Sequence, residues 1–562
     1  MKKNILVILF CVYSFLTHSQ QNENGVSGGF ESNGQWYLND KGLKDEFNNI
    51  TTQPEDPVRS NNYLFVNYLY KKWSFGIQGE SYTQNALLNM NPKYNETNVA
   101  TYFARYQTNK IDITAGYYYE QFGSGLLLRA WEDRALGINN ALRGVRVIYK
   151  PDEFITMKYI YGQQRTGFDV ANSKIYGIDF EFDLKTPLNL NISDLTIGWN
   201  YIGRYENLDL PVQSFDDLTN AFSGRINFSH NAFYINTEVS YKLDDAVVQS
   251  SDQVNNRLVK PGNALLMNTG YSKKGFGIDA TFRRLENMSF FSERGAKGNN
   301  FNDRLMNYIP SLTKQQHYNL ANIYVYQAQP GVFIDGDGDE EKVRAGEIGG
   351  QLDLFYDVKK GTLLGGKNGI KIAVNLSNWN ALSGTFYILS PQDYQTDFLR
   401  FGKRYYTDVN IEVTKKWNSK WLSAFSYVNQ YYNKNSIGIE PGIVYTDIVA
   451  AEATYKFMSN KSIRVVGEHM WASDKKKNWA SATVECNLNS KYSFYAIDLY
   501  NYGNEKEYQR NHYYNFGGSY RNKSTRIALS YGRQRGGLVC VGGVCRNVPE
   551  SSGISLSLNT SF

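Results

Sequence analysis

Alternation of apolar and polar residues with a period of two is the feature that most constrains the fold of this chain. In the last segment, Ile554 and Leu556 fall on one face, and Ser555 and Ser557 fall on the other. A strand points successive side chains to opposite faces of its sheet, so this segment predicts a strand with one apolar and one polar face. The same alternation recurs in three internal segments, at residues 176–184, 370–377 and 405–414.

Long apolar runs are missing from the rest of the sequence. After Gln20, no run approaches the ~20 residues that a membrane-spanning helix requires. Charged residues make up 20% of the chain and the mean hydropathy is -0.49, which is too polar for a helical membrane protein. An open sheet with an apolar face would leave backbone groups unpaired in lipid. The sequence therefore predicts an all-β fold, a transmembrane antiparallel β-barrel with lipid outside and water inside.

The connections between the expected strands fall into two classes, which typify the short periplasmic turns and long extracellular loops of outer-membrane barrels. The short class is polar and often contains lysine, as at residues 71–72, 273–275 and 415–417. The long class includes residues 39–61, 82–97, 287–317 and 382–403. The spacing predicts about 26 strands, with about 24 as the alternative. An even number requires an extra short strand between residues 287 and 347, near Val332.

The N-terminus predicts an export signal. Two lysines precede an apolar stretch from Ile5 to Leu16, and Thr17 and Ser19 supply the small residues of a cleavage site. A transmembrane anchor is the alternative, but an apolar run of roughly 12 residues is too short to span a bilayer. We expect residues 1–19 to be a signal peptide and residues 20–562 to be the barrel.

The last residue, Phe562, closes a serine-rich amphipathic segment. Chains inserted by the outer-membrane assembly machinery commonly end in such a strand with a terminal aromatic residue, and a soluble β-protein that ends in Phe is the alternative. Together with the export signal and the unequal loops, Phe562 predicts an assembly signal and a place in the outer membrane of a Gram-negative bacterium. Lipid, lipopolysaccharide, the assembly machinery and lipoproteins are the expected partners; no basic run suggests nucleic acid.

Two cysteines near the C-terminus predict a disulfide. Cys540 and Cys545 flank a segment in which Gly542 and Gly543 suit a two-residue primed turn. In that hairpin the two cysteines form a non-hydrogen-bonded pair with Cα atoms about 4.5 Å apart. This separation is within disulfide range, and the periplasm is oxidising. A metal site is the alternative, but no histidine lies nearby. Cys486 alternates with apolar residues and is expected to be a small lipid-facing side chain.

A segment from Phe122 to Arg146 packs opposite charges into a connection between two strands. It could fold inward and narrow a pore, with its charges setting a transverse field that selects solutes. A loop held to the barrel wall by ion pairs is the alternative. The candidate constriction residues are Arg129, Glu132, Asp133, Arg134, Arg143 and Arg146.

An acidic segment resembles the start of a calcium loop, with Asp335, Asp337 and Asp339 at the first, third and fifth positions. Glu340 stands where an EF-hand requires glycine and Gly346 where it requires glutamate, so an EF-hand is excluded. A looser calcium site remains a hypothesis, because clustered carboxylates repel one another without a cation. A solvated acidic loop is the alternative, and no other cofactor is expected.

Four features of the chain together resemble a known family. These are the Lys-, Asn- and Tyr-rich composition, Phe-Gly-Ser-Gly-Leu at residues 122–126, Cys-Val-Gly-Gly-Val-Cys-Arg at residues 540–546, and the serine-rich strand ending in Phe562. They are similar to an uncharacterised, porin-like family of Bacteroidota outer-membrane barrels, which implies location and fold over the whole mature chain but no established activity. The chain departs from TonB-dependent transporters, because residues 25–38 already resemble a barrel strand and leave little room for a plug domain.

The functional hypotheses follow from this architecture. The first is a porin-like channel for passive diffusion of small polar solutes, indicated by polar inward faces and the missing plug domain. The second is an accessory or structural barrel subunit of an outer-membrane secretion or protein-assembly complex, since the loops are long enough to bind partners. The sequence contains no H-E-x-x-H pattern and no catalytic arrangement of residues stands out, so we expect no enzymatic activity.

Overall fold

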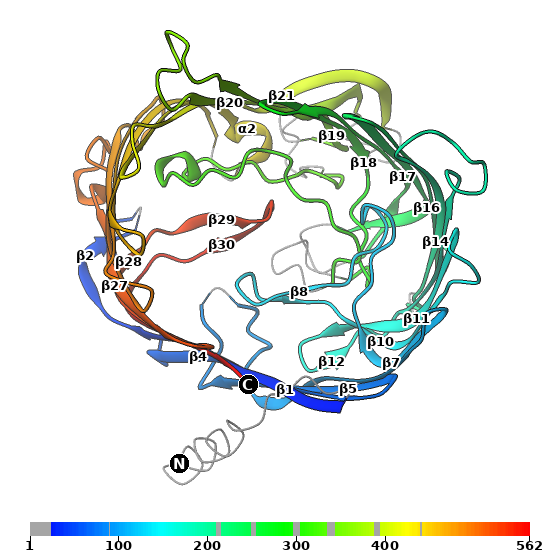
Figure 1. Ribbon diagram of the computed structural model, residues 1–562. Coiled ribbons are helices and arrows are strands. Elements are labelled where there is room, and N and C mark those ends of the chain that lie inside the picture. Colours follow the sequence, from blue (N-terminus) through cyan, green and yellow to red (C-terminus); the bar gives the residue numbers. More distant parts are fainter. Residues whose placement is uncertain are drawn as a thin grey trace.

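A closed antiparallel β-barrel of 24 strands forms the body of the protein, and one extra short strand pairs with its wall. The computed structural model describes residues 24–45, 47–88, 90–208, 215–248, 254–295, 304–333, 343–386, 394–438 and 441–562. Figure 1 views the barrel along its axis. No helix among these residues is long and apolar enough to cross a membrane.

The wall strands follow one another around the barrel in the order of the sequence. They are β1 (Asn24–Tyr37), β4 (Val58–Tyr70), β5 (Trp73–Thr83), β6 (Thr97–Gln107), β7 (Ile111–Tyr118), β10 (Leu142–Tyr149), β11 (Ile155–Thr166), β13 (Lys174–Asp183), β14 (Asp194–Tyr205), β15 (Leu218–His230), β16 (Phe233–Val248), β17 (Val254–Lys273), β18 (Phe276–Glu286), β19 (Gly346–Val358), β20 (Ile370–Thr385), β21 (Gln395–Lys416), β22 (Trp421–Asn433), β23 (Ile443–Met458), β24 (Lys461–Ala472), β25 (Trp479–Asn487), β26 (Tyr492–Tyr500), β27 (His512–Asn522), β28 (Thr525–Gln534) and β31 (Ser551–Ser561).

The remaining elements lie in the connections. The extra strand β12 (Asp169–Val170) pairs only with β11. Three separate two-stranded sheets are β2 (Asp40–Lys44) with β3 (Ile50–Thr51), β8 (Glu132–Asp133) with β9 (Ile138–Asn139), and β29 (Gly537–Val541) with β30 (Val544–Val548). The short helical elements are η1 (Leu320–Asn322), α2 (Lys434–Ile437) and η3 (Glu507–Gln509).

The first and last strands close the barrel. β1 pairs with β4 on one side and with β31 on the other, where the register runs from Gly29 opposite Ser561 to Tyr37 opposite Gly553. Beyond that register, the backbones of Gly28 and Phe562 exchange two hydrogen bonds of 3.0 Å each. No wall strand is left with a free edge, which is what a sheet surrounded by lipid requires. The predicted closed barrel is confirmed.

The predicted alternation of faces is also confirmed. On β21, Ile411 is 42% exposed on the outer face, whereas Asp408 and Asn410 are 1% and 0% exposed on the inner face. On β31, Leu556 is exposed outside, and the Ser557 hydroxyl donates a hydrogen bond of 2.9 Å to Asn33 inside. Neighbouring strands therefore share one outer apolar face and one inner polar face.

The number of wall strands is the predicted alternative of 24 and not about 26, and the extra wall strand predicted near Val332 is wrong. β18 pairs directly with β19 along its whole length, from Phe276 opposite Tyr356 to Glu286 opposite Gly346. A long connection that leaves and re-enters at the same end of the barrel joins two antiparallel neighbours without a third strand. The hairpin of β29 and β30 pairs only with itself and adds nothing to the wall.

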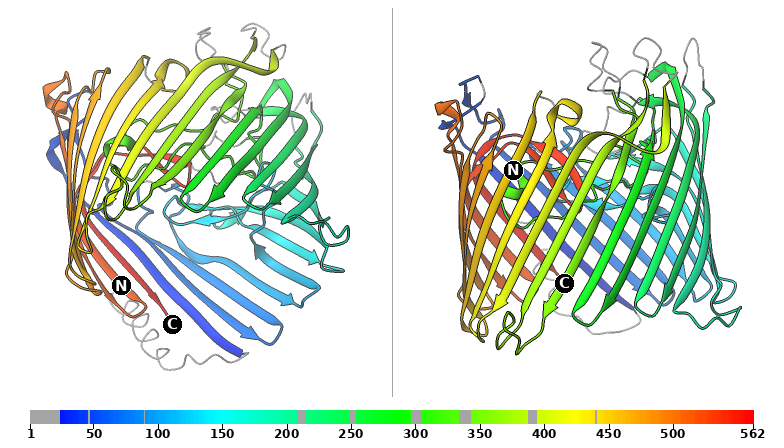
Figure 2. Two further views of the ribbon diagram at one scale, coloured as in Figure 1. Left: turned by 45° about the horizontal axis from the view of Figure 1, so that its top comes forward. Right: turned by 90° about the horizontal axis from the view of Figure 1, so that it is seen from above.

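The short and long connections segregate to opposite ends of the barrel, as predicted. Figure 2 shows the long connections extending from one end and the short turns at the other. We call these the loop end and the turn end. Both termini of the described chain, at β1 and β31, lie at the turn end, because β1 leaves it and β31 returns to it.

Candidate functional site in the lumen

Three connections from the loop end fold back into the lumen, where Figure 1 shows them inside the ring of strands. The Tyr308 N–H donates a hydrogen bond of 2.9 Å to the Gly125 carbonyl, and the Ser311 N–H donates one of 2.8 Å to the Gly543 carbonyl. These bonds join the three connections into one body. We call their described residues within 119–141, 287–333 and 535–550 the luminal plug.

Apolar side chains seat the luminal plug against the wall. Phe122 and Phe290 are fully buried in a cluster with wall residues such as Ile175 and Leu285. A second cluster places Leu320 against strands β22 to β24. Each large apolar side chain buried in this way contributes about 1.5–3 kcal/mol. Apolar residues therefore occur on the inner face of the wall where the plug covers them, which is the exception to the polar lumen.

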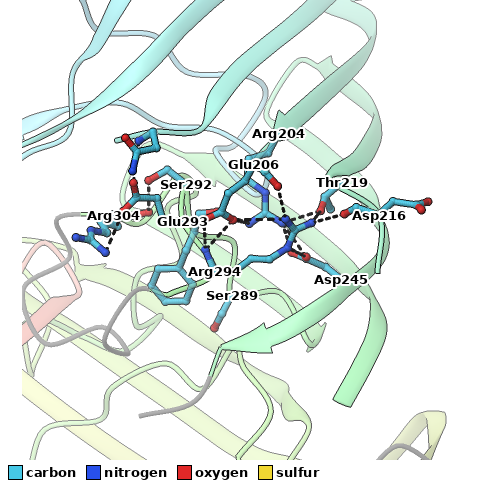
Figure 3. A network of polar contacts seen from close by, with 12 residues as sticks. Arg204, Glu206, Asp216, Thr219, Asp245, Ser289, Ser292, Glu293, Arg294 and Arg304 are labelled. Atoms are coloured by element: carbon cyan, nitrogen blue, oxygen red, sulfur yellow. Dashed lines mark hydrogen bonds and ion pairs between the residues drawn. The ribbon is translucent and has the colours of Figure 1, made fainter. Parts of the chain in front are cut away.

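A buried ion-pair network anchors the plug to β14 and β16, and Figure 3 shows it at close range. Arg294 of the plug donates a hydrogen bond of 2.8 Å to Asp245, and Arg204 of the wall donates one of 2.7 Å to the same carboxylate. Glu206 accepts a hydrogen bond of 3.0 Å from the Arg294 N–H, and burial raises the pKa of the Glu206 carboxyl. All four residues are 5% exposed or less. Losing one charge would leave its partners uncompensated, so the network holds this segment in place.

Carboxylates elsewhere in the wall cap backbone groups of the plug. Glu347 on β19 accepts hydrogen bonds of 2.6 Å from Arg283 and from the Gln329 N–H. Glu468 on β24 accepts one of 2.8 Å from the Leu320 N–H. Charge-assisted hydrogen bonds are stronger than neutral ones. The plug is therefore attached at several points around the barrel.

The hairpin of β29 and β30 carries the predicted disulfide. Cys540 and Cys545 are bonded, with Cα atoms 4.0 Å apart, which confirms the pairing. Gly542 and Gly543 have φ of 58° and 77°, as a two-residue primed turn requires. The Tyr308 hydroxyl donates a hydrogen bond of 2.9 Å to the Gly542 carbonyl. The disulfide thus cross-links the hairpin beside its contact with another part of the plug.

An arc of alternating charges lines the lumen on the turn side of the plug. From one ion pair to the next it consists of Arg105, Asp112, Arg146, Glu120, Lys158, Asp179, Arg225 and Glu181, all of them on wall strands except Glu120, which belongs to the plug. Neighbouring charges lie 2.6 to 3.8 Å apart. Opposite charges held side by side along one wall set a local transverse field, which acts on any ion or dipole that passes.

A cavity of about 500 Å³ lies between this arc and the plug. Its lining is polar apart from Leu266 and includes Asn227, Asn236 and Asn268, which lie opposite one another on β15, β16 and β17. Glu238 accepts hydrogen bonds of 2.7 Å from the Ser124 N–H and 2.5 Å from Ser223. The charged lining residues are Glu120, Asp179, Glu181 and Glu238, with Lys158 and Arg225. Since carboxylates outnumber cations, the cavity favours positively charged polar solutes.

The residues predicted to form a constriction lie in different surroundings. Arg146 belongs to the charged arc. Arg134 pairs with Glu132 at 3.3 Å and with Glu31 of the wall at 2.9 Å. Arg129 stacks over a tyrosine ring at 3.8 Å, and Asp133 accepts a hydrogen bond of 2.9 Å from a backbone N–H of its own loop. The segment folds inward, and ion pairs also hold it to the wall, so both interpretations of the sequence describe part of the structure.

Arg143 does not belong to this group, and its assignment is a correction. It lies on the outer face of β10, which it shares with Val145, a residue that is 43% exposed. Arg143 and Arg146 are three positions apart, and an odd separation along a strand places side chains on opposite faces. Counting along the strand would have excluded Arg143 from the sequence alone.

Other predictions concern residues that the structure does not test. The proposed calcium ligands Asp335, Asp337 and Asp339, and the signal peptide at residues 1–19, lie outside the described residues. Phe562 is described at the closing seam of the barrel, and its role as an assembly signal stays a prediction.

Sequence analysis missed most of the charged arc. The alternation at residues 176–184 puts Asp179 and Glu181 on the polar face of that segment, but no local pattern links them to Arg225 or Lys158. These four residues come from three wall strands, and they meet only because of the register between those strands. An alternating strand supplies the face on which a charge lies but not its neighbours on the next strand.

Comparison with known proteins identifies a family over the entire sequence, since residues 1–562 match it. The chain belongs to DUF6029, a family of unknown function. No curated protein matches this DUF6029 member. Among solved structures, it is similar to the siderophore receptor PirA from Pseudomonas aeruginosa, with a TM-score of 0.40 and 8% identity over 97% of this chain and 81% of that one.

Two further structures show a likeness of the same order. For the P pilus usher PapC translocation pore, the TM-score is 0.40 and the identity 8%, over 95% of this chain and 99% of that one. For the copper transporter OprC, the TM-score is 0.42 and the identity 10%, over 97% of this chain and 81% of that one. All three comparisons extend over nearly the whole DUF6029 chain.

Proposed function

We propose that this DUF6029 member is an integral protein of the outer membrane of a Gram-negative bacterium, surrounded by lipid and lipopolysaccharide. The support is a closed barrel whose outer face exposes large apolar side chains, such as Leu556 at 49% and Ile411 at 42%. The resemblance of its sequence to Bacteroidota barrels supports such a source. We also propose that the outer-membrane assembly machinery inserts the chain by its C-terminal strand.

Within that membrane, we infer that the protein is a channel for small polar solutes whose width is set by the luminal plug. Strands about 4.8 Å apart and tilted by about 40° give 24 strands a backbone radius of ~24 Å. Barrels of 16–18 strands already leave an aqueous channel when their lumen is unfilled. Permeability of this wider barrel therefore depends on the plug and on the spaces beside it.

The observation that carries this proposal is the polar cavity between the plug and the charged arc. Its volume of about 500 Å³ suits a small solute or a hydrated ion. Its surplus of carboxylates favours cations, as acidic rings do in cation channels. The role is transport and not catalysis.

Conductance of the purified barrel in planar lipid bilayers tests the proposal. We expect small, cation-selective currents from the natural protein. Replacement of two carboxylates of the cavity lining, Glu181→Gln with Glu238→Gln, should reduce the cation selectivity. The matched control is Glu153→Gln, which removes an exposed carboxylate from a turn. A folded, inserted barrel without any conductance would refute the channel.

One observation favours a second candidate, an accessory or structural subunit of an outer-membrane secretion or assembly complex. Arg294 of the plug is attached to the barrel by buried charge pairs with Asp245 and Glu206, which suits a barrel that stays shut and serves as a scaffold. A barrel that is silent in the bilayer and purifies in fixed stoichiometry with lipoproteins would support this role. A conducting barrel that purifies alone would exclude it.

A further inference from the structure

The connection between β19 and β20 presents two leucines to the outside at the turn end. Leu363 is 102% exposed and Leu364 is 72% exposed. In Figure 1 this connection projects outside the ring beside β20. Exposed apolar side chains are unfavourable in water, so an ordered loop that presents two of them is suited to an apolar environment.

Backbone hydrogen bonds fix the shape of this loop, residues 359–369. The Gly361 N–H donates a hydrogen bond of 2.8 Å to the Gly366 carbonyl, and the Gly366 N–H donates one of 2.9 Å to the Thr362 carbonyl. The Asn368 side chain ties the loop to the next turn through a hydrogen bond of 2.6 Å to the Trp417 carbonyl. The two leucines therefore stand on a defined loop that is attached to the barrel rim.

Lysines surround the leucines. Lys359, Lys360 and Lys367 belong to the loop, and Lys273, Lys274 and Lys416 lie on or beside the adjacent turns. All six are exposed, and none forms an ion pair with another residue that the structure describes. Asp357 is the exposed acidic residue beside them. This sector of the rim is thus strongly basic around an apolar tip.

Exposed aromatic residues mark the same level of the barrel. Trp417, in the turn before β22, is 56% exposed, and Trp421, at the start of β22, is 46% exposed. Tryptophan and tyrosine gather where the acyl chains of a bilayer meet its head groups. The leucine loop therefore projects from the level at which a membrane interface is expected.

We propose that this sector of the turn end docks onto anionic phospholipid of the surrounding leaflet. Leu363 and Leu364 enter the acyl region, and the lysines contact the phosphate groups. Lysine reaches such a surface well, because its stem is apolar and its end is charged. The inference rests on the proposed location in a membrane and adds a lipid class and a contact surface to it.

Nitroxide labels on the full-length barrel, reconstituted in phosphatidylcholine vesicles with and without phosphatidylglycerol, test this inference. The label is placed at Leu363→Cys in a Cys486→Ser background, and Ser459→Cys on another exposed turn is the matched control. A label on the natural Cys486, on the outer face of β25, reports whether the barrel has inserted. A second variant changes Lys359, Lys360 and Lys367 to Gln and is assayed for phosphatidylglycerol retained by the purified barrel.

We expect the label at position 363 to be several-fold more accessible to oxygen and less accessible to a water-soluble nickel chelate than the label at 459. Enrichment of phosphatidylglycerol should fall by about fivefold for each lysine removed. A label at 363 that remains in water while the Cys486 label is in lipid would overturn the docking inference alone and would point to a protein partner. Unchanged phosphatidylglycerol enrichment would overturn its anionic part. If the Cys486 label also remained in water, the proposed membrane location would fail as well.

Discussion

Loss of one buried carboxylate, in the variant Asp245→Asn, should release part of the luminal plug from the wall. Asp245 accepts hydrogen bonds of 2.7 Å from Arg204 and 2.8 Å from Arg294, and it is 4% exposed. Lys242 is also buried nearby, at 2% exposed. Asparagine has a similar volume but no charge, so the variant leaves three buried cations facing the single carboxylate of Glu206.

The size of the effect follows from the cost of an unpaired buried charge. Removing one partner of a buried ion pair costs about 3–5 kcal/mol. At about 1.4 kcal/mol for each factor of ten, local opening of the segment at residues 287–295 should become roughly 100-fold to 4,000-fold more frequent. The backbone ladders of the wall do not involve this contact, so the barrel itself should remain closed.

Hydrogen exchange read by mass spectrometry measures this opening directly. The Arg294 N–H is hydrogen-bonded to Glu206 at 3.0 Å, so its exchange reports detachment of the plug. The control is Asp397→Asn, which removes an exposed pair with Arg400, where the two side chains are 50% and 77% exposed. A surface pair contributes about 0–1 kcal/mol, so this control should change exchange by fivefold at most. Unchanged exchange around Arg294 in a folded Asp245→Asn barrel would refute the anchoring role of the network.

Three further perturbations test other parts of the structure. Replacement of Cys540 and Cys545 by serine should destabilise the luminal hairpin by about 2 kcal/mol, because the disulfide no longer closes its very short loop. The looser hairpin should make single-channel currents noisier. Currents as quiet as those of the natural protein would contradict this prediction. The variant Phe562→Ser should lower the amount of heat-modifiable, folded barrel in the outer membrane, whereas Ser561→Ala should leave it unchanged. The variant Glu347→Gln should raise exchange of the Gln329 N–H, which donates to that carboxylate at 2.6 Å, and should leave exchange of the Leu320 N–H at Glu468 as it was.

The sequence by itself determined the class of fold and the hairpin cross-link. Both follow from local rules that act over a few residues. A strand points successive side chains in opposite directions, so alternation such as that around Ile411 and Asn410 predicts which face meets lipid. A Gly-Gly turn likewise brings Cys540 and Cys545 together without help from the rest of the chain. The unequal lengths of the connections are also a local feature of the sequence, and they predicted that short and long connections lie at opposite ends of the barrel.

The number of strands was harder to predict from the sequence, because a long connection can contain an extra strand or none. The region between Glu286 and Gly346 shows this, since the residues of it that the structure describes lie in the lumen and add no strand to the wall. The same region also shows why its own part of the plug was not predicted. Apolar residues such as Phe290 and Met306 resemble parts of an ordinary loop until the barrel encloses them.

Only the tertiary structure decided which charged side chains lie next to one another in the lumen. Arg225 and Asp179 are 46 positions apart in the chain, yet they are 2.6 Å apart in the barrel. Their contact depends on the register across three strands, and a shift of one residue in a single pairing would turn one of them outward. Long-range register and the path of a loop inside a closed barrel are set by packing over the whole chain, and no local pattern encodes them.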